Sequence, residues 1–198
     1  MVVEPIFSVV DTETTGFRFD KGARVIEIAV VRMSADGTIL GTFSTLINPG
    51  NDVDLGAIEI HKITRSMISD APTFAEITGD FISIVSNSLL VAHNAQFDMQ
   101  FLEGEFDLAG YDWPVQHVLD TLRAARVLIP GLPSYKLAKL ASHLGICFEG
   151  NPHAALADAL VTAKLHAALL RRTENLIWPD PELITWPAVS STGLAKNR

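Results

Sequence analysis

Four acidic residues stand in segments that are otherwise apolar, and they constrain the fold of this 198-residue chain more than any other feature. Asp11 and Glu13 lie in FSVVDTETTG, Asp98 lies in VAHNAQFD, and Asp158 lies in NPHAALADA. Asp11 and Glu13 are two apart in a predicted strand, so both point to one face, about 6–7 Å apart. Four bare carboxylates facing an apolar interior would be strongly destabilising. Bound divalent cations would neutralise them, and hard oxygen ligands suit Mg²⁺ or Mn²⁺.

Length and composition predict one domain with a substantial core and limit where it works. No apolar run approaches the length of a membrane span, and the N-terminus lacks the features of a signal peptide. The single cysteine, Cys147, excludes an intrachain disulfide and fits the reducing cytoplasm. We expect it to be a buried structural thiol. The net charge of −8 argues against tight binding of duplex nucleic acid and favours contact with only a few phosphates.

Strands and helices alternate along most of the chain. Residues 6–11 are apolar at both parities, which is typical of a central strand covered on both faces. Residues 25–33 and 39–47 predict two further strands, joined as a hairpin by the turn SADG. The remaining elements are expected in this order: a helix from 73, a strand over 88–93, a helix over 95–109, a short strand within 118–122, a helix capped by Asp120, a helix over 134–146 and a long helix over 153–172. This order predicts an α/β fold, a mixed sheet of a three-strand antiparallel meander plus parallel strands, with helices on both faces.

Two further features complete the organisation. After Thr173 the periodic pattern ends, so we expect a domain over 1–173 and an irregular tail over 174–198. Glu27 interrupts the second predicted strand. It is either a further site carboxylate or a structural partner at the sheet edge, and we favour the structural role because nothing around it repeats the site pattern.

The acidic residues fit a site for two cations. Such cations lie about 3.5–4 Å apart and stabilise the attacking and leaving oxygens of an in-line displacement. We expect Asp11 to bridge both ions, Glu13 and Asp158 to complete the shell of one, and Asp98 to hold the other, directly or through water. The sequence therefore predicts a two-metal phosphoryl-transfer enzyme.

His153 is the candidate general base. It precedes Asp158 by five residues, about 140° around a helix, so the two can meet only if the histidine lies off the helix. An imidazole at the helix entrance is suited to accepting a proton from water near neutral pH. Each part has an ordinary explanation when taken alone: Asp98 as a first-turn helix acid, and His93 and Asn94 as partners of local backbone groups. Their joint occurrence in this order favours the catalytic interpretation.

These motifs resemble those of the DEDDh exonucleases, the 3′–5′ exonuclease family that includes the proofreading epsilon subunit of bacterial DNA polymerase III, ribonuclease T and oligoribonuclease. DTETTG matches the first motif, HNAQFD the second, and HAALADA the third, with the five-residue step from His153 to Asp158. Weaker matches surround His61 and Asp120. The likeness spans about Phe7 to Leu170, is closest to the epsilon-type branch, and implies a ribonuclease H-like fold.

The resemblance also implies a binding site for the terminal nucleotide. Its expected residues are Thr14, Thr15, Gly16, Phe17, His61, Asn94 and Phe97. Phe17 stands where the family often places a wedge against the terminal bases. The expected partner is a nucleic acid 3′ end, single-stranded or frayed, with a DNA polymerase as a candidate protein partner and no membrane.

The function expected from the sequence is hydrolysis of the terminal phosphodiester, with release of nucleoside 5′-monophosphates. Two divalent cations, Mg²⁺ or Mn²⁺, would act with His153 as the base, and DNA is the favoured substrate. Two alternatives remain open: an exoribonuclease of the same family and a non-catalytic subunit that binds strand ends. A nucleoside-triphosphate enzyme is disfavoured because no Gly-rich phosphate loop followed by lysine is present.

Overall fold

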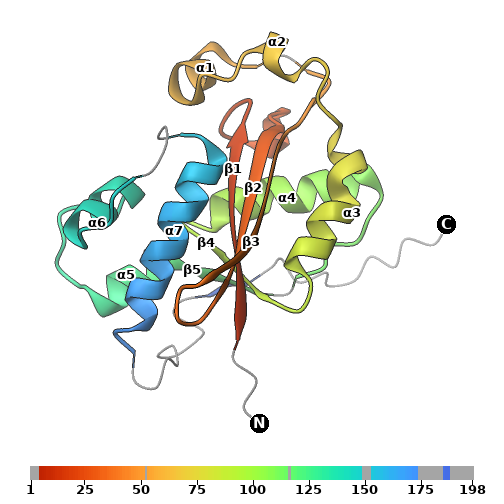
Figure 1. The fold of residues 1–198 in the computed structure, drawn as a ribbon. Coiled ribbons are helices and arrows are strands. Elements are labelled where there is room, and N and C mark those ends of the chain that lie inside the picture. Colours follow the sequence, from red (N-terminus) through yellow and green to blue (C-terminus); the bar gives the residue numbers. More distant parts are fainter. Residues whose placement is uncertain (1–4, 52, 116, 149–152, 174–184, 188–198) are drawn as a thin grey trace.

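The apolar segment near the start of the chain forms β1 (Ile6–Thr14), an interior strand of a six-stranded sheet (Figure 1). A computed structural model describes residues 5–51, 53–115, 117–148, 153–173 and 185–187. The strand order is β3-β2-β1-β4-β5-β6. The other strands are β2 (Val25–Ser34), β3 (Ile39–Leu46), β4 (Leu89–Ala92), β5 (His117–Asp120) and β6 (Thr185–Pro187).

The sheet is mixed, as the sequence predicts. β1, β2 and β3 form an antiparallel meander, while β4 runs parallel to β1 and β5 runs parallel to β4. β4 is short, apolar and buried from Leu90 onward, which is typical of a strand covered on both faces. Because β1, β4 and β5 run parallel, their carboxyl ends lie at the same end of the sheet. The first two acidic motifs lie there, at the end of β1 and after β4.

Helices cover both faces of the sheet (Figure 1). One face packs against α5 (Thr121–Leu128), α6 (Leu137–His143) and α7 (Ala155–Leu170). The other packs against α3 (Phe74–Val85) and α4 (Gln96–Ala109). β1 divides its side chains between the two cores by alternation: Phe7 and Val9 face α7, and Val10 faces the side of α3 and α4. The predicted α/β class with helices on both faces is confirmed.

Two short helices, α1 (Leu55–His61) and α2 (Arg65–Ile68), lie beyond the ends of β1 and β2 (Figure 1). The sequence did not predict either helix. α1 is only seven residues long and α2 only four, so neither shows a helical repeat of apolar residues. The side chain of Asp54 caps α1 by accepting a hydrogen bond of 2.7 Å from the Gly56 amide.

The longer helices differ in how they begin. Thr73 and Glu76 form a capping box at the start of α3, and Asp120 accepts a hydrogen bond of 2.9 Å from the Leu122 amide at the start of α5, as predicted. The N-cap of α7 is Ala154, which has no side chain able to accept a hydrogen bond. The partner of the first α7 amide therefore comes from elsewhere in the fold.

The segment between β1 and β2 is anchored on α4 at two points. Phe19 packs edge-on against Phe101 at a centroid distance of 6.0 Å, and its ring fills the space that a side chain at Gly104 would need. Arg24 forms an ion pair with the buried Glu105, with Nε 2.7 Å from Oε1. The loop that follows DTETTG is thus held by the helix that carries Asp98.

Two sequence-based expectations are wrong at the residues the structure describes. Thr185–Pro187 of the expected irregular tail form β6, which pairs antiparallel with β5 at the edge of the sheet. Three residues are too few to show a strand period, and proline is tolerated at a sheet edge. Residues 174–184 and 188–198 lie outside the described part of the chain. Cys147 is exposed, because it lies in the loop that follows α6.

Among the helices of the described residues, we find none with the length and apolar character needed to cross a membrane.

Candidate active site

One face of β1 changes from apolar to acidic along its length. Asp11 and Glu13 continue the row that begins with Phe7 and Val9, so their carboxylates lie on the α7 side of the sheet. In the neighbouring strand β2, Ala29 pairs with Asp11 and Glu27 pairs with Glu13. The end of β1 therefore presents two acidic side chains next to the beginning of α7.

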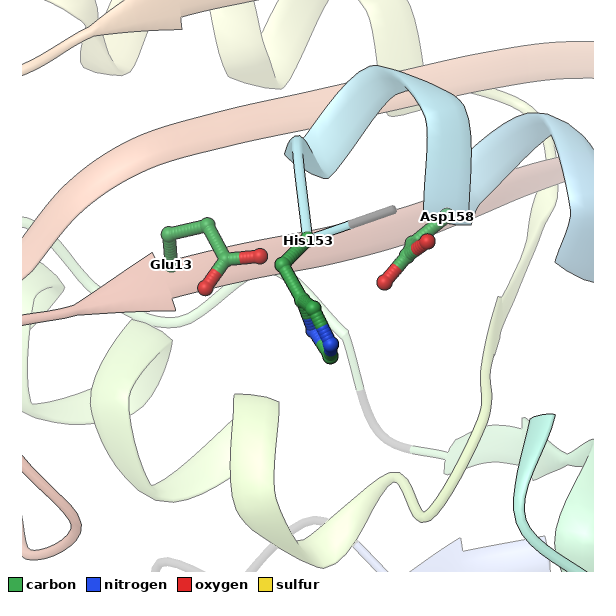
Figure 2. Close-up of side chains that lie close together, drawn as sticks. All are labelled: Glu13, His153 and Asp158. Atoms are coloured by element: carbon green, nitrogen blue, oxygen red, sulfur yellow. The ribbon is translucent and has the colours of Figure 1, made fainter. Parts of the chain in front are cut away.

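The start of α7 brings His153 and Asp158 close to the Glu13 carboxylate (Figure 2). The helix begins at Ala155, so Asp158 lies in its first turn and His153 lies before it in a turn, with a left-handed φ of 62°. Side-chain ligand atoms of Glu13, His153 and Asp158 all lie within 4.8 Å of one another. His153 thus lies off the helix, the condition that the five-residue spacing set for the two residues to meet.

Asp98 reaches the same site from the opposite face of the sheet. It lies in the first turn of α4 and is 4% exposed. Its Oδ1 accepts two hydrogen bonds from Thr12, one from the backbone amide at 3.0 Å and one from the hydroxyl at 2.8 Å. Thr12 alternates with Asp11 and Glu13 along β1, so it faces α4. These two bonds fix the Asp98 carboxylate against the strand.

The carboxylates have raised pKa values, chiefly because burial disfavours their charged forms. The pKa of Asp11 lies well above its usual value, with further increases from Asp98, Asp158, Glu13 and Glu27. Burial raises the pKa of Glu13 to about 8, helped by Asp158 and Glu27, and burial raises that of Asp98 to about 7 against the two bonds from Thr12. The pKa of Asp158 is also raised by burial, while the nearby His153 lowers it. The site therefore gathers carboxylates whose charged forms are disfavoured as long as only the described residues surround them.

This donor set fits divalent cations. The groups are hard oxygen ligands from three separate elements, as Mg²⁺ and Mn²⁺ prefer. The Oδ1 atom of Asp158 is buried and has no hydrogen-bond partner among the described residues. A buried carboxylate oxygen without a donor is the kind of atom that a cation would satisfy.

All five predicted catalytic residues line one cleft with a volume of about 510 Å³. Asn94 and Phe97, two of the residues expected to bind the terminal nucleotide, line it as well. Asn94 has a left-handed φ of 63°, and its backbone N–H donates a hydrogen bond of 3.0 Å to Asp120 Oδ1. The turn between β4 and α4 is therefore well fixed. The sequence thus identified the acidic side of this cleft.

Thr15, Gly16 and Phe17 line a second pocket of about 470 Å³ that starts where β1 ends. Their backbone is held by neighbouring segments: the Thr15 amide donates to the Arg24 carbonyl at 2.8 Å, and the Asp54 amide donates to the Thr15 carbonyl at 3.1 Å. The Phe17 side chain is 71% exposed. An aromatic ring this exposed on a fixed loop is available to a ligand rather than to the core.

His61 and Thr14 lie beside each other at the end of α1. The Nδ1 atom of His61 accepts a hydrogen bond of 3.0 Å from the Ile63 amide, which leaves the proton of the neutral ring on Nε2. Burial lowers the pKa of His61, the nearby Thr14 backbone acts in the opposite direction, and the charge of His153 lowers it further. The buried Nε2 atom has no hydrogen-bond partner among the described residues. The Thr14 hydroxyl donates to the Gly16 carbonyl at 2.7 Å.

Seven residues that line the cleft were not among the predicted site residues: Thr12, His93, Leu122, Arg126, Tyr135, Lys136 and Leu137. Three of these, Arg126 of α5 and Tyr135 and Lys136 before α6, carry polar groups outside the acidic motifs. The Arg126 guanidinium lies 5.8 Å from the centre of the Tyr135 ring. The only sequence signal for them was their position in the weakly matching segment LDTLRAARVLIPGLPSYKLAKLA. His93, by contrast, has the structural role considered for it, since its ring bonds to the Thr121 hydroxyl at 2.9 Å and the Tyr135 carbonyl at 3.0 Å.

Glu27 supplies the missing cap of α7. Its Oε2 accepts a hydrogen bond of 3.0 Å from the Ala155 amide. Glu27 therefore has a structural partner, as favoured from the sequence, but β2 is an interior strand rather than an edge.

Comparison with protein families supports the exonuclease assignment. A family model described as "Exonuclease" (RNase_T) matches residues 8–166. The chain is 37% identical over 167 residues to a DNA polymerase III subunit epsilon of Treponema pallidum, covering 83% of this chain and 76% of the relative. It is 40% identical over 159 residues to a PolC-type DNA polymerase III of Clostridium perfringens, and there it spans 80% of this chain but only 11% of the relative.

Solved structures share the fold. Exonuclease X, in a complex with 5′ overhanging duplex DNA, matches with a TM-score of 0.71 and 27% identity over 90% of this chain and 96% of that one. The nuclease domain of 3′hExo, a DEDDh family member bound to rAMP, matches with a TM-score of 0.78 and 18% identity, over 91% and 98% of the two chains. The second likeness concerns the fold alone, and it agrees with the predicted ribonuclease H-like architecture.

Proposed function

The chain belongs to the DEDDh family of 3′–5′ exonucleases, and we propose that its substrate is the 3′ end of single-stranded or frayed DNA. The observation that supports this most is the cleft that gathers Asp11, Glu13, Asp98, His153 and Asp158 from both faces of the sheet. DNA is favoured because relatives at 34–40% identity are parts of DNA polymerase III. An exoribonuclease remains the alternative within the family.

The four carboxylates would hold two cations in this cleft. Exonucleases of this family use divalent metal ions, and when bound these stabilise the charge that develops on the phosphate and the leaving oxygen. The raised pKa values of Asp11, Glu13 and Asp98 and the unpartnered oxygen of Asp158 support this assignment. Asp98 would keep its orientation through Thr12, whereas Asp158 has an oxygen available.

His153 would accept the proton of the attacking water. Its imidazole lies within 4.8 Å of the Glu13 and Asp158 carboxylates, and it is exposed to the cleft rather than buried. The water oxygen forms a bond to phosphorus while the bond to the 3′-oxygen of the preceding nucleotide breaks. That oxygen takes up a proton and stays on the shortened strand, and the released nucleotide carries the 5′-phosphate.

The loop after β1 would bind the terminal nucleotide. Thr14, Thr15 and Gly16 are anchored by backbone hydrogen bonds, so their position does not need to be created on binding. Phe17 and Phe97 would contact the terminal bases, and His61 and Asn94 would complete this site. Base stacking on an aromatic ring contributes about 1–3 kcal/mol per base in proteins that bind single strands.

Arg126 and Lys136 would hold phosphates of the strand that leads into the cleft. They are exposed cations in the wall of an otherwise acidic site, on a chain of net charge −8. Two such contacts agree with a footprint of a few phosphates and with moderate salt dependence.

A second expected partner is a DNA polymerase in the cytoplasm, as for an epsilon subunit. The coverage of 76% of one epsilon relative supports that comparison.

The proposal is tested by digestion of 5′-labelled DNA and RNA strands of the same sequence with Mg²⁺ or Mn²⁺. We expect a ladder that shortens by single nucleotides from the 3′ end, with DNA digested faster, and no digestion in excess chelator.

A second experiment compares 3′ ends. Frayed 3′ ends should be digested faster than paired ones, and Phe17→Ala should reduce this preference. Tyr111→Ala, at a half-exposed aromatic after α4, is the matched control. Absence of digestion, with binding of the ends retained, would favour the non-catalytic subunit.

A further inference from the structure

The first turn of α7 depends on a residue that lies 128 positions earlier in the chain. The first amides of a helix have no partner within the helix and are usually satisfied by a side chain at the N-cap. The N-cap here is Ala154, and the Ala155 amide donates instead to Oε2 of Glu27 in β2 at 3.0 Å. A carboxylate at a helix N-terminus is also favoured by the helix dipole.

This turn carries two of the proposed catalytic residues. Asp158 belongs to it directly, because its amide donates to the Ala154 carbonyl at 3.1 Å. His153 lies two residues before Ala155, in a left-handed conformation that non-glycine residues rarely adopt. The position of the Ala155 amide therefore decides where both side chains lie.

Glu27 links that turn to the strand that carries Glu13. It pairs with Glu13 across β2 and β1, so the two glutamates lie next to each other on one face of the sheet. Glu13, His153 and Asp158 form the close group of ligand atoms shown in Figure 2. Through Glu27, the start of the helix that brings His153 and Asp158 is fixed against β2, the neighbour of the strand that carries Glu13.

A helix cap alone does not require this arrangement. Serine, threonine, asparagine or aspartate at position 154 would cap α7 locally, as Asp120 caps α5. Glu27 instead adds negative charge to an acidic site and raises the pKa of both Asp11 and Glu13. Because the capping side chain lies on β2 rather than at position 154, it joins the start of α7 to the sheet as well as capping the helix.

We propose that Glu27 is a positioning residue for the proton acceptor, holding the first turn of α7 so that His153 lies beside Glu13 and Asp158. The role of His153 is part of the proposed function, on which this inference rests. Glu27 acts through its hydrogen bond, so an uncharged side chain of the same length should serve nearly as well.

The first test compares Glu27→Gln, which keeps an acceptor oxygen, with Glu27→Ala and the shorter Glu27→Asp. The substrate is the p-nitrophenyl ester of thymidine 5′-monophosphate with Mn²⁺. We expect kcat to fall by about 10–100-fold in the Ala and Asp variants with little change in KM, the size expected when a catalytic group is misplaced. Glu27→Gln should keep most of kcat. If the Ala variant does not fold, the Gln and Asp variants still decide.

The matched control is Glu76, which caps α3, a helix without site residues. Glu76→Ala should lower stability without lowering kcat. In a His153→Ala background, Glu27→Ala should cause a much smaller further loss than in the wild type, because only the displacement of Asp158 remains and residues that act through one group are not additive. An equal further loss in that background, or a Gln variant as slow as the Ala variant, would overturn the positioning role.

A second readout does not depend on turnover. Hydrogen exchange at the Ala155 amide should become faster in Glu27→Ala and remain slow in Glu27→Gln. Unchanged protection of the Ala155 amide in Glu27→Ala would overturn the inference, even if the wild-type enzyme hydrolyses the ester. Failure of the wild type to hydrolyse the ester would instead contradict the proposed function, and the two failures are thereby distinguished.

Discussion

Asp98 and Asp158 are both first-turn acids of long helices, yet the two faces of the sheet hold them differently. Asp98, on α4, is bound by the amide and hydroxyl of Thr12. Asp158, on α7, has a buried oxygen without a partner among the described residues, and His153 lies beside it. The α4 side of the site is therefore fixed by the protein itself. The other side leaves its ligand atom free for a cation and a water molecule.

The largest expected effect concerns the carboxylates on the α7 side. Asp11→Asn and Asp158→Asn should each abolish turnover while the protein stays folded, because the lost charge weakens cation binding at the site. The measurement is the rate on 5′-labelled single-stranded DNA with Mn²⁺, with circular dichroism to check the fold. Activity comparable to wild type in either variant, or activity that persists in excess chelator, would contradict the two-metal assignment.

The next effect concerns the residue that stands beside Asp158 but not beside Asp98. His153→Ala should lower the rate by about 10²–10⁴-fold, the usual contribution of a positioned general base. Cation binding should change much less, which isothermal titration with Mn²⁺ can measure. His143→Ala, in the last turn of α6, is a control histidine outside the cleft. A His153 variant with nearly wild-type rate would mean that the proton goes elsewhere.

Stability should separate the two aspartates directly. Asp98→Ala leaves the buried Thr12 amide and hydroxyl without their acceptor, so we expect a loss of about 1–3 kcal/mol in the free energy of unfolding. Asp158→Ala removes no hydrogen bond to its Oδ1. It gives up the favourable interaction of the carboxylate with His153 but relieves repulsion with Asp11 and Glu13, so stability in chelator should change little. Urea unfolding measures both, with the exposed Asp80→Ala as the control. Equal losses would show that the two sides are held alike.

The last effect is a pH dependence of the metal-free protein. The pKa values of Glu13, about 8, and Asp98, about 7, lie above the ordinary values of 4.5 and 3.8. Between the ordinary and the raised values the folded state binds more protons than the unfolded state, so stability falls as pH rises. The melting temperature in chelator should therefore decrease from about pH 5 to about pH 9. Mn²⁺ should reduce this decrease, because it binds only the folded site. A melting temperature that rises with pH in chelator would contradict the raised values.

The fold and the acidic side of the site could be predicted because their signals are local. Alternation placed Asp11 and Glu13 on one face of a strand, and helical spacing placed Asp98 and Asp158 on two helices. The five-residue step correctly required His153 to lie off its helix, since α7 begins at Ala155. In each case one segment of sequence contains the whole pattern.

The features that the sequence did not reveal depend on contacts between distant segments. β6 exists through pairing with β5, and α1 and α2 are too short to show a period. The hydrogen bond from Ala155 to Glu27 joins residues far apart in the chain, so the sequence indicated a structural role without its partner. Arg126 lies on α5 and Lys136 lies just before α6, both outside the three acidic motifs, and they meet the cleft only in the folded chain.

Gly104 has a consequence for how this domain can be altered or recombined. A glycine inside a helix lowers the stability of the helix by about 1 kcal/mol relative to alanine. At position 104 the glycine makes room for the Phe19 ring. The loop after β1 and the helix with Asp98 are therefore complementary in shape at this point. A chimera that takes residues 15–24 from a relative would need the residue at position 104 from the same source. The loop and the helix are expected to change together, as one exchangeable unit.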